Sequence, residues 1–306
     1  MNNPRYGAGD VGPGVESPGP SSFPVVSSSD LASASDPASP SDPASPSDPA
    51  SPSNLASPAG LAVPPGEVAV AAAEVFGERL ELAGRFAELL GTEGVVRGLI
   101  GPRETPRLWE RHLVNCGVMS QIIPFGASVV DVGSGAGLPG IVLAVARPDL
   151  VITLVEPLAR RTAFLDEAVA ELGLGGNVTV VRGRAEEVAG HLPGADIVTA
   201  RAVAALDKLA GWCLPLASVG GRLLALKGAS AAEEIVSHEQ AVGSLGGGVP
   251  VVRLCGVGLI EPPATVVEIV KERDVVPGRA RRAAPARKSA AGEGRRGGGR
   301  GRSRRS

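Results

Sequence analysis

Aromatic side chains are scarce in this chain of 306 residues, which has five phenylalanines, two tryptophans and one tyrosine. Between residues 66 and 276 the aromatic positions are few and widely spaced: Phe76, Phe86, Trp109, Phe125, Phe164 and Trp212. Proteins that bind single-stranded nucleic acid without sequence preference stack its bases on aromatic side chains. The scarcity argues against a stacking platform of that kind. Any recognition of RNA is then expected to depend on shape and phosphate contacts.

Cysteine and histidine are also rare, with three of each. The cysteines, Cys116, Cys213 and Cys255, are far apart and form no C-x-x-C motif. We therefore expect no disulfide framework and predict no metal site. The sequence identifies no partner for His191 or His238, which are expected at the surface.

A long uncharged apolar run is missing as well. The most apolar stretch, residues 68–90, is interrupted by charged residues that include Glu74, Glu78, Arg79, Glu81 and Arg85. This pattern excludes a simple membrane span. No basic segment followed by an apolar one marks a secretory signal at the N-terminus. We expect a cytoplasmic protein without membrane contact.

Both ends of the chain depart from globular composition. Residues 1–65 are rich in Ser, Pro and Ala, with S-D-P-A-S-P in tandem around residues 35–52. Residues 277–306 hold eleven basic residues and one acid, although the whole chain has a formal net charge of −2. Such segments bury too little apolar surface to offset their ordering entropy, so both are predicted to be disordered. The basic tail, with Arg295 and Arg296, is either an arm that attracts RNA or a solubilising terminus.

Residues 66–276 are predicted to form one domain, with helices over residues 67–120 as an N-terminal cap. One helix is expected over residues 67–90, with an apolar stripe at Val70, Ala73, Phe76, Leu80, Ala83 and Ala87. A second is expected to start near residue 105. Strands are predicted at 128–131, 150–155, 178–182, 196–200, 222–226, 249–254 and 264–270, with helices at 141–146, 157–172, 206–216 and 230–245.

This alternation predicts an α/β fold with a mostly parallel sheet of seven strands, covered on both faces. The last two strands have no helix between them, which predicts an antiparallel edge strand. The combination is typical of the Rossmann-like class I methyltransferases that use S-adenosylmethionine.

The segment 128–140 reads S-V-V-D-V-G-S-G-A-G-L-P-G, which is a strand, a tight turn and a helix start. Gly133, Gly135 and Gly137 permit backbone conformations closed to other residues and let a ligand approach the main chain. A dinucleotide would place its anionic pyrophosphate here, where Asp131 would repel it. S-adenosylmethionine carries a cationic amino group and sulfonium instead, so Asp131 favours it.

Further polar residues follow the later strands. Glu156 ends the second strand, where an acid can accept hydrogen bonds from ribose hydroxyls. Ala185 and Glu186 follow the third strand and could meet an adenine ring, although acids at a helix start are also ordinary dipole partners. Arg201 and Lys227 end the next two strands. Arg201 is predicted to contact a cofactor carboxylate or an RNA phosphate, with a buried salt bridge as the alternative.

Four motifs together resemble the bacterial small-subunit ribosomal RNA guanine-N7 methyltransferase family, RsmG or GidB: R-H at 111–112, D-V-G-S-G-A-G-L-P-G-I at 131–141, A-R-A at 200–202 and L-K-G at 226–228. The resemblance covers roughly residues 67–272. It implies cofactor contacts at Gly133, Leu138, Ala185, Glu186 and Arg201. Two departures concern RNA docking: L-G-T-E-G-V-V-R-G precedes the R-H helix in place of an aromatic and Asn-rich segment, and Asn115-Cys116 stands where members often have Asp-Ser.

The resemblance implies methyl transfer to N7 of a guanine in 16S rRNA, guanine 527 of the 530 loop, within the small ribosomal subunit. Because N7 already has a lone pair, no general base is expected, and catalysis is mainly alignment. Arg201, Lys227 and His112 are the predicted positioning residues. Arg111, His112, Lys227, Arg295 and Arg296 are the predicted RNA-binding residues. A monomer is expected.

Two other functions fit parts of the pattern. A non-catalytic RNA-binding or ribosome-assembly protein could use a methyltransferase fold and bind through its tail. An NAD-dependent oxidoreductase could share the glycine turn and Glu156, although Asp131 argues against it.

Overall fold

The computed structural model describes residues 25–26, 60–201 and 204–275. The tandem repeat, Arg295 and Arg296 lie outside these ranges, as do nearly all residues of the two predicted tails. The described residues from Gly60 to Asp274 belong to one compact unit. The body packs from Leu61 onward, because the Leu61 side chain is buried and Trp109 Nε1 donates to its carbonyl oxygen at 2.8 Å.

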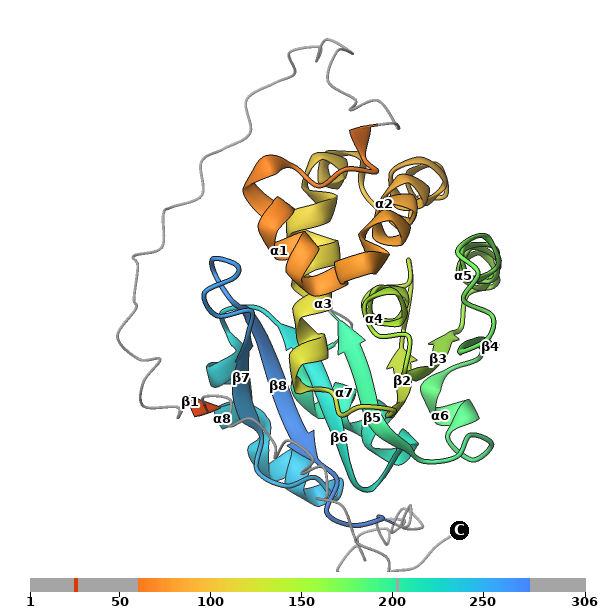
Figure 1. The fold of residues 1–306 in the computed structure, drawn as a ribbon. Coiled ribbons are helices and arrows are strands. Elements are labelled where there is room, and N and C mark those ends of the chain that lie inside the picture. The colour runs from red at the N-terminus through yellow and green to blue at the C-terminus, as the bar shows by residue number, and fades with distance from the viewer. Residues whose placement is uncertain (1–24, 27–59, 202–203, 276–306) are drawn as a thin grey trace, which may run out of the picture. The chain divides into compact units, whose positions relative to one another are not determined.

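One mixed sheet forms the centre of the fold (Figure 1). The strands are β1 (Val25–Val26), β2 (Ser128–Val132), β3 (Val151–Glu156), β4 (Val178–Arg182), β5 (Ala195–Arg201), β6 (Ala217–Lys227), β7 (Val251–Cys255) and β8 (Ala264–Val270). Their order is β1-β7-β8-β6-β5-β2-β3-β4. Strands β4, β3, β2, β5 and β6 pair in parallel. The predicted mostly parallel α/β sheet is confirmed.

Two details of the sheet differ from the prediction. The antiparallel strand β8 lies between β6 and β7, not at the edge. Helix α8 carries the chain from β6 past this position to β7, and the short connection back places β8 in the gap. The sheet also has an eighth strand, because the two residues of β1 pair antiparallel with β7. Val25 and Val26 fall in the Ser- and Pro-rich segment, where apolar residues are too few to signal a strand.

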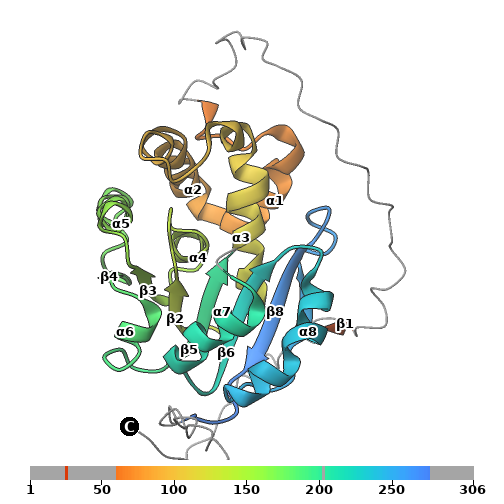
Figure 2. The ribbon, with the colours of Figure 1, turned by 180° about the vertical axis from the view of Figure 1, so that it is seen from behind.

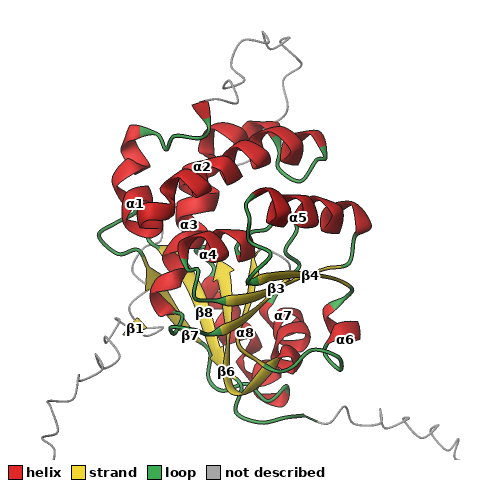
Figure 3. Cartoon of the chain, turned by 45° about the vertical axis from the view of Figure 1, so that its right-hand side comes forward, coloured by secondary structure: helices red, strands yellow, loops and turns green. Residues whose placement is uncertain are grey.

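Helices cover both faces of the sheet (Figures 2 and 3). Helices α4 (Gly140–Ala146) and α5 (Ala159–Glu171) lie on one face, and α6 (Ala185–Val188), α7 (Leu206–Cys213) and α8 (Ala231–Ser244) lie on the other. Successive strand residues point to opposite faces. Val129 therefore joins the core beneath α4, whereas Val130 joins the core beneath α7. Burial on both faces explains why the central strands are almost continuously apolar.

The N-terminal cap differs from the single predicted helix over residues 67–90. Helix α1 (Gly66–Phe76) ends at Gly77, whose φ of 49° is left-handed, and a short 3₁₀ turn (Gly77–Arg79) leads into α2 (Leu80–Leu89). The predicted stripe is wrong at its start, because Val70 is 77% exposed and Val68, Ala71 and Ala72 are buried instead. A glycine can be helical or left-handed, so the spacing alone did not mark this break.

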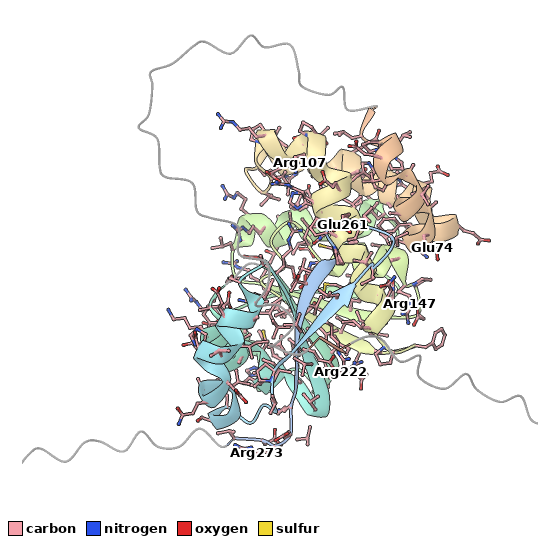
Figure 4. All side chains as sticks on the ribbon, turned by 90° about the vertical axis from the view of Figure 1, so that its left-hand side faces the viewer. Glu74, Arg107, Arg147, Arg222, Glu261 and Arg273 are labelled. Atoms are coloured by element: carbon pink, nitrogen blue, oxygen red, sulfur yellow. The ribbon has the colours of Figure 1, made fainter. Side chains whose placement is uncertain are left out.

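The second part of the cap is a run of helical turns from Pro102 to Ile122. It consists of a 3₁₀ turn (Pro102–Arg107), a π-helical turn (Trp109–Val114), α3 (Asn115–Gly117) and a final 3₁₀ turn (Val118–Ile122). Two arginines that are labelled in Figure 4 hold its end: Arg147 directly follows α4, and Arg222 belongs to β6. Arg147 donates to the carbonyl oxygens of Ser120 and Ile123, each at 3.1 Å, and Arg222 donates to that of Ile122 at 3.1 Å. The cap is thereby fixed against the sheet.

Candidate active site

The candidate site lies at the carboxyl edge of the parallel strands, where the predicted segments come together. The glycine turn follows β2, Glu156 ends β3, Arg201 ends β5 and Lys227 ends β6. From β2 the chain adds β3 and β4 on one side of the sheet, and it then adds β5 and β6 on the other side of β2. The strand order therefore reverses at β2. Open α/β sheets bind ligands in the crevice at such a switch point.

The glycine turn has the backbone that its composition predicts. Gly133, Gly135 and Gly137 have φ values of 70°, 57° and 85°, a left-handed region that other residues avoid. Gly140 has a different role, because a Cβ there would lie 2.3 Å from Leu154 Cδ2 and 2.7 Å from Asp131 Oδ2. The last glycine of the motif therefore lets α4 pack closely on the strands, and the first three shape the loop.

Asp131 lies beneath the loop and is fully buried. Its Oδ2 accepts a hydrogen bond from the Gly140 N–H at 3.1 Å, and its Oδ1 accepts one from Thr199 Oγ1 at 3.1 Å. Burial raises the pKa of Asp131 to about 6. Both oxygens of the buried carboxylate thus accept hydrogen bonds that join β2, β5 and the start of α4. Asp131 would therefore act on a cationic ligand through its charge and not through direct contact.

Glu156 is also turned toward the protein, with 1% exposure. Its Oε2 accepts from the Gly135 N–H and its Oε1 from the Leu158 N–H, each at 3.0 Å. Arg161 Nη1 lies 3.6 Å from Oε2. The side chain predicted to bind ribose thus holds the glycine loop to the start of α5. Arg161, which the sequence did not indicate as a site residue, lies beside both Glu156 and Gly135.

Ala185 and Glu186 begin α6 directly after β4. Ala185 is buried, and the Glu186 side chain is exposed at the start of the helix. The next residue, Glu187, accepts a hydrogen bond from the Arg184 N–H at 3.0 Å. The two predicted residues therefore lie at the same sheet edge as the glycine loop, on the side of β4.

Arg201 connects the sheet edge to the cap. Its Nη2 donates to His112 Nδ1 at 2.5 Å, and its Nη1 donates to Cys116 Sγ at 3.2 Å. His112 and Cys116 are buried on consecutive turns of the cap. The salt bridge considered as the alternative is not observed among the residues that the structure describes. Arg201 is instead half-buried and held by two neutral acceptors.

His112 receives its second contact from Glu104, whose Oε2 lies 3.2 Å from His112 Nε2. Burial and the Arg201 charge lower the pKa of His112 to about 4, so the ring is neutral near pH 7. An arginine can only donate, so Nδ1 must be the acceptor and the proton is on Nε2. Sequence reasoning missed Glu104, since a glutamate eight residues before a histidine has no distinctive spacing.

Lys227 and Arg111 are both paired. Lys227 Nζ donates to the Ala204 carbonyl oxygen at 2.8 Å and to Glu234 Oε2 at 2.7 Å. Arg111 Nη1 lies 3.5 Å from Glu104 Oε1. Lys227 and Arg201 line one pocket of about 610 Å³, whose wall also includes Asn115 from the cap. The structure thus brings Arg201, Lys227 and His112 to one region.

The sequence also predicted two surface histidines without partners, no metal site and no membrane span. His191 and His238 do have neighbours: His191 Nδ1 lies 3.0 Å from the Glu187 carbonyl oxygen, and His238 Nδ1 lies 3.7 Å from Asp207 Oδ1. Within the described ranges, no group of three or more His, Cys, Asp and Glu side chains could hold a metal ion. No helix in the described part of the chain is long and apolar enough to cross a membrane.

The residues at the edge fit S-adenosylmethionine by their chemistry. The loop turns through glycines without side chains, two carboxylates lie beneath it, and a guanidinium stands on the next strand for an anionic group. Negative charge near the loop suits a sulfonium and disfavours a pyrophosphate. The fold and this site define a class I S-adenosylmethionine-dependent methyltransferase.

Comparison with known proteins gives the family. The family model described as rRNA small subunit methyltransferase G (GidB) matches residues 79–258, and the chain belongs to this family. Among the relatives named ribosomal RNA small subunit methyltransferase G are three that share 60–65% identity with this chain. The one from Salinispora tropica is 62% identical over 74% of this chain and 95% of its own length. Those from Salinispora arenicola and Rhodococcus jostii are 65% and 60% identical, covering 69% and 64% of this chain and 89% and 87% of their own lengths.

Among solved structures, a predicted O-methyltransferase from Agrobacterium tumefaciens aligns with a TM-score of 0.42 and 19% identity, over 52% of this chain and 81% of that chain. Membership of the methyltransferase family decides against the two other functions considered from the sequence. The chain is an enzyme, and its cofactor is S-adenosylmethionine.

Proposed function

We propose that this enzyme transfers a methyl group from S-adenosylmethionine to N7 of a guanine in the 16S rRNA of the small ribosomal subunit. The names of the relatives support ribosomal RNA of the small subunit as the substrate. The family resemblance supports guanine 527 of the 530 loop as the target. The cytoplasm is the proposed location and a monomer the proposed state.

The observation that carries this proposal is the position of Arg201 beside the glycine loop. Strands β2 and β5 are direct neighbours, with Val132 paired to Ala200, so the loop and Arg201 start from adjacent points of the edge. A pocket lined by Arg201, Lys227 and Asn115 lies at the carboxyl ends of the neighbouring strands β5 and β6. A cofactor held over the loop and a base held in this pocket would meet at the β2–β5 boundary.

S-adenosylmethionine supplies an electrophilic methyl group on a positively charged sulfur. Guanine N7 has a lone pair in its neutral form, so the protein need not remove a proton. The titratable side chains predicted for this site agree with a positioning role. His112 is neutral and held between Arg201 and Glu104, and Lys227 is held by Glu234 and a carbonyl oxygen. Alignment of the reacting atoms and exclusion of water would supply most of the rate.

We propose the following division of roles. Gly133, Gly135, Gly137 and Leu138 form the cofactor loop, Asp131 and Glu156 hold it in shape, and Ala185 and Glu186 line its far side. Arg201 orients the cofactor or the target nucleotide through its guanidinium. Arg111 on the cap, Lys227, and Arg295 and Arg296 of the basic tail would contact RNA.

The test uses small ribosomal subunits that lack the modification, radiolabelled S-adenosylmethionine, and the full chain beside a Gly133→Asp variant. The left-handed φ of 70° and the bulk of a side chain where the ligand approaches the main chain should together abolish cofactor binding in the variant. Label on one guanine, lost in the variant, is the expected result. Equal RNA binding by both proteins with no transfer by either would contradict the proposal.

A further inference from the structure

Glu104, His112 and Arg201 form one chain of hydrogen bonds from the cap to the sheet edge. Glu104 belongs to the 3₁₀ turn Pro102–Arg107, His112 to the next helical turn, and Arg201 to the end of β5. The distances along the chain are 3.2 Å from Glu104 Oε2 to His112 Nε2 and 2.5 Å from His112 Nδ1 to Arg201 Nη2. The family motifs that pointed to Arg201 and His112 do not include Glu104.

The His112 imidazole can make both of these hydrogen bonds in only one protonation state. Arg201 presents N–H donors to Nδ1, so a proton on Nδ1 would replace a hydrogen bond with two opposed donors. The other nitrogen, Nε2, must then carry the proton, and a carboxylate 3.2 Å away accepts it. The partner of one ring nitrogen sets which nitrogen is protonated. Glu104 is therefore placed to fix the tautomer that Arg201 needs.

We propose that Glu104 is a positioning residue for methyl transfer, which acts by holding His112 so that Nδ1 keeps the Arg201 guanidinium at the sheet edge. Glu104 itself touches neither the glycine loop nor the pocket of Arg201 and Lys227. This inference rests on the proposed function, because it takes Arg201 to act at the site of methyl transfer.

The charges around the ring agree with this role. His112 faces Arg201 from β5 and Glu104 and Arg111 from the cap, and the buried thiol of Cys116 binds the other nitrogen of Arg201. Arg111 lies 3.5 Å from the second oxygen of Glu104, so the carboxylate also links two cap turns. A purely structural role for Glu104 through Arg111 is the competing account, and the experiment has to separate the two.

The experiment is a double-mutant cycle on the full chain, measured as kcat/KM for methyl transfer to unmodified small subunits. Glu104→Ala should lower kcat/KM about tenfold, the loss expected for one charge-assisted hydrogen bond. His112→Asn removes the imidazole, so its own kcat/KM should fall as well, and it serves as the second background of the cycle. Adding Glu104→Ala to His112→Asn should then cost nothing further, because Glu104 has no imidazole to hold.

Two further variants separate the accounts. Glu104→Gln keeps an oxygen that can accept from Nε2–H and should restore most of the activity lost in Glu104→Ala. Glu110→Ala removes a glutamate of the neighbouring turn that pairs with Arg107, and should leave activity unchanged. An equal loss from Glu104→Ala in the wild-type and His112→Asn backgrounds would overturn the proposal in favour of the structural account.

A spectroscopic readout needs no substrate. The chain has three histidines, so ¹⁵N-histidine labelling gives three imidazoles, and His112→Asn assigns the one of interest. Near pH 7, His112 should show a protonated Nε2 and an unprotonated Nδ1, and Glu104→Ala should mix in the other tautomer. A protonated Nδ1 in the wild type would overturn the proposal. If the wild type shows this tautomer but transfers no methyl group, the proposed function fails and the geometric inference survives.

Discussion

Arg201 and His112 are 89 residues apart in the chain and are joined by a hydrogen bond of 2.5 Å between Nη2 and Nδ1. The bond connects the last residue of β5 to the N-terminal cap, and Cys116 on the next turn of the cap receives the second nitrogen of Arg201. The cap is consequently part of the site. Its attachment to the sheet through Arg147 and Arg222 fixes where the guanidinium lies.

Replacing Arg201 with lysine should impair methyl transfer although the charge is kept. A lysine ammonium is a single point charge and cannot bind Nδ1 of His112 and Sγ of Cys116 in the same fork geometry. We expect kcat/KM to fall roughly 10- to 100-fold, the equivalent of one or two charge-assisted hydrogen bonds. Arg273→Lys is the matched control, because Arg273 binds the Gly243 carbonyl oxygen at the other end of β8. Equal activity of Arg201→Lys and wild type would show that the fork is dispensable.

Gly140→Ala should destabilise the fold. The added Cβ would lie 2.3 Å from Leu154 Cδ2 and 2.7 Å from Asp131 Oδ2, so the start of α4 would have to move away from the strands. Overpacking of this kind costs about 1–3 kcal/mol. Gly243→Ala in α8 meets no atom within 4 Å and should stabilise the protein by about 0.5–1 kcal/mol. Urea denaturation of both variants checks the pair, and an equal effect of the two would refute the close-packing role of Gly140.

The stability of the protein should fall as pH rises from about 4 to about 6, through Asp131. Burial raises the pKa of this carboxyl from 3.8 to about 6, so the folded state holds the proton in a range where the unfolded state has lost it. The penalty is complete above about pH 6 and amounts to roughly 3 kcal/mol. Other groups titrate in this range, so the measured quantity is the difference in unfolding free energy between wild type and Asp131→Asn. This difference should change between about pH 4 and 6 and be constant above, and a pH-independent difference would contradict the assignment.

His112 should contribute no pH dependence to the rate of methyl transfer between about pH 6 and 8. Guanine N7 needs no deprotonation, and the pKa of His112 is lowered to about 4 by burial and by Arg201, so the ring stays neutral throughout. A profile of kcat/KM against pH for wild type and His112→Asn checks this. An acid limb with an apparent pKa near 6.5 that is present in wild type and absent in the variant would show that His112 titrates during catalysis.

Much of the fold and part of the site were predictable, because they depend on local patterns. Strands β4 and β8 begin and end at the predicted residues, since short β-branched runs bounded by turns leave little freedom. The left-handed glycines were predictable because their spacing has few other uses. The position of β8 between β6 and β7 was not predictable, because strand order depends on pairing between segments that are far apart in the sequence.

Side-chain partners were the least predictable feature. Glu156 was expected to bind a ribose, and the sequence did not indicate that its two oxygens also accept from the N–H groups of Gly135 and Leu158. Glu104 was missed because its function depends on His112, which itself is placed by the docking of the cap. Both contacts join residues through tertiary packing, which no spacing in the sequence encodes.

We propose that methyl transfer occurs at guanine N7 and depends on Arg201 at the β2–β5 boundary. The most direct measurement is nucleoside mass spectrometry of 16S rRNA from unmodified small subunits incubated with S-adenosylmethionine and either wild type or Arg201→Ala. We predict one equivalent of 7-methylguanosine with wild type and little or none with the variant. Methylation of another atom, or full 7-methylguanosine formation by Arg201→Ala, would contradict the account.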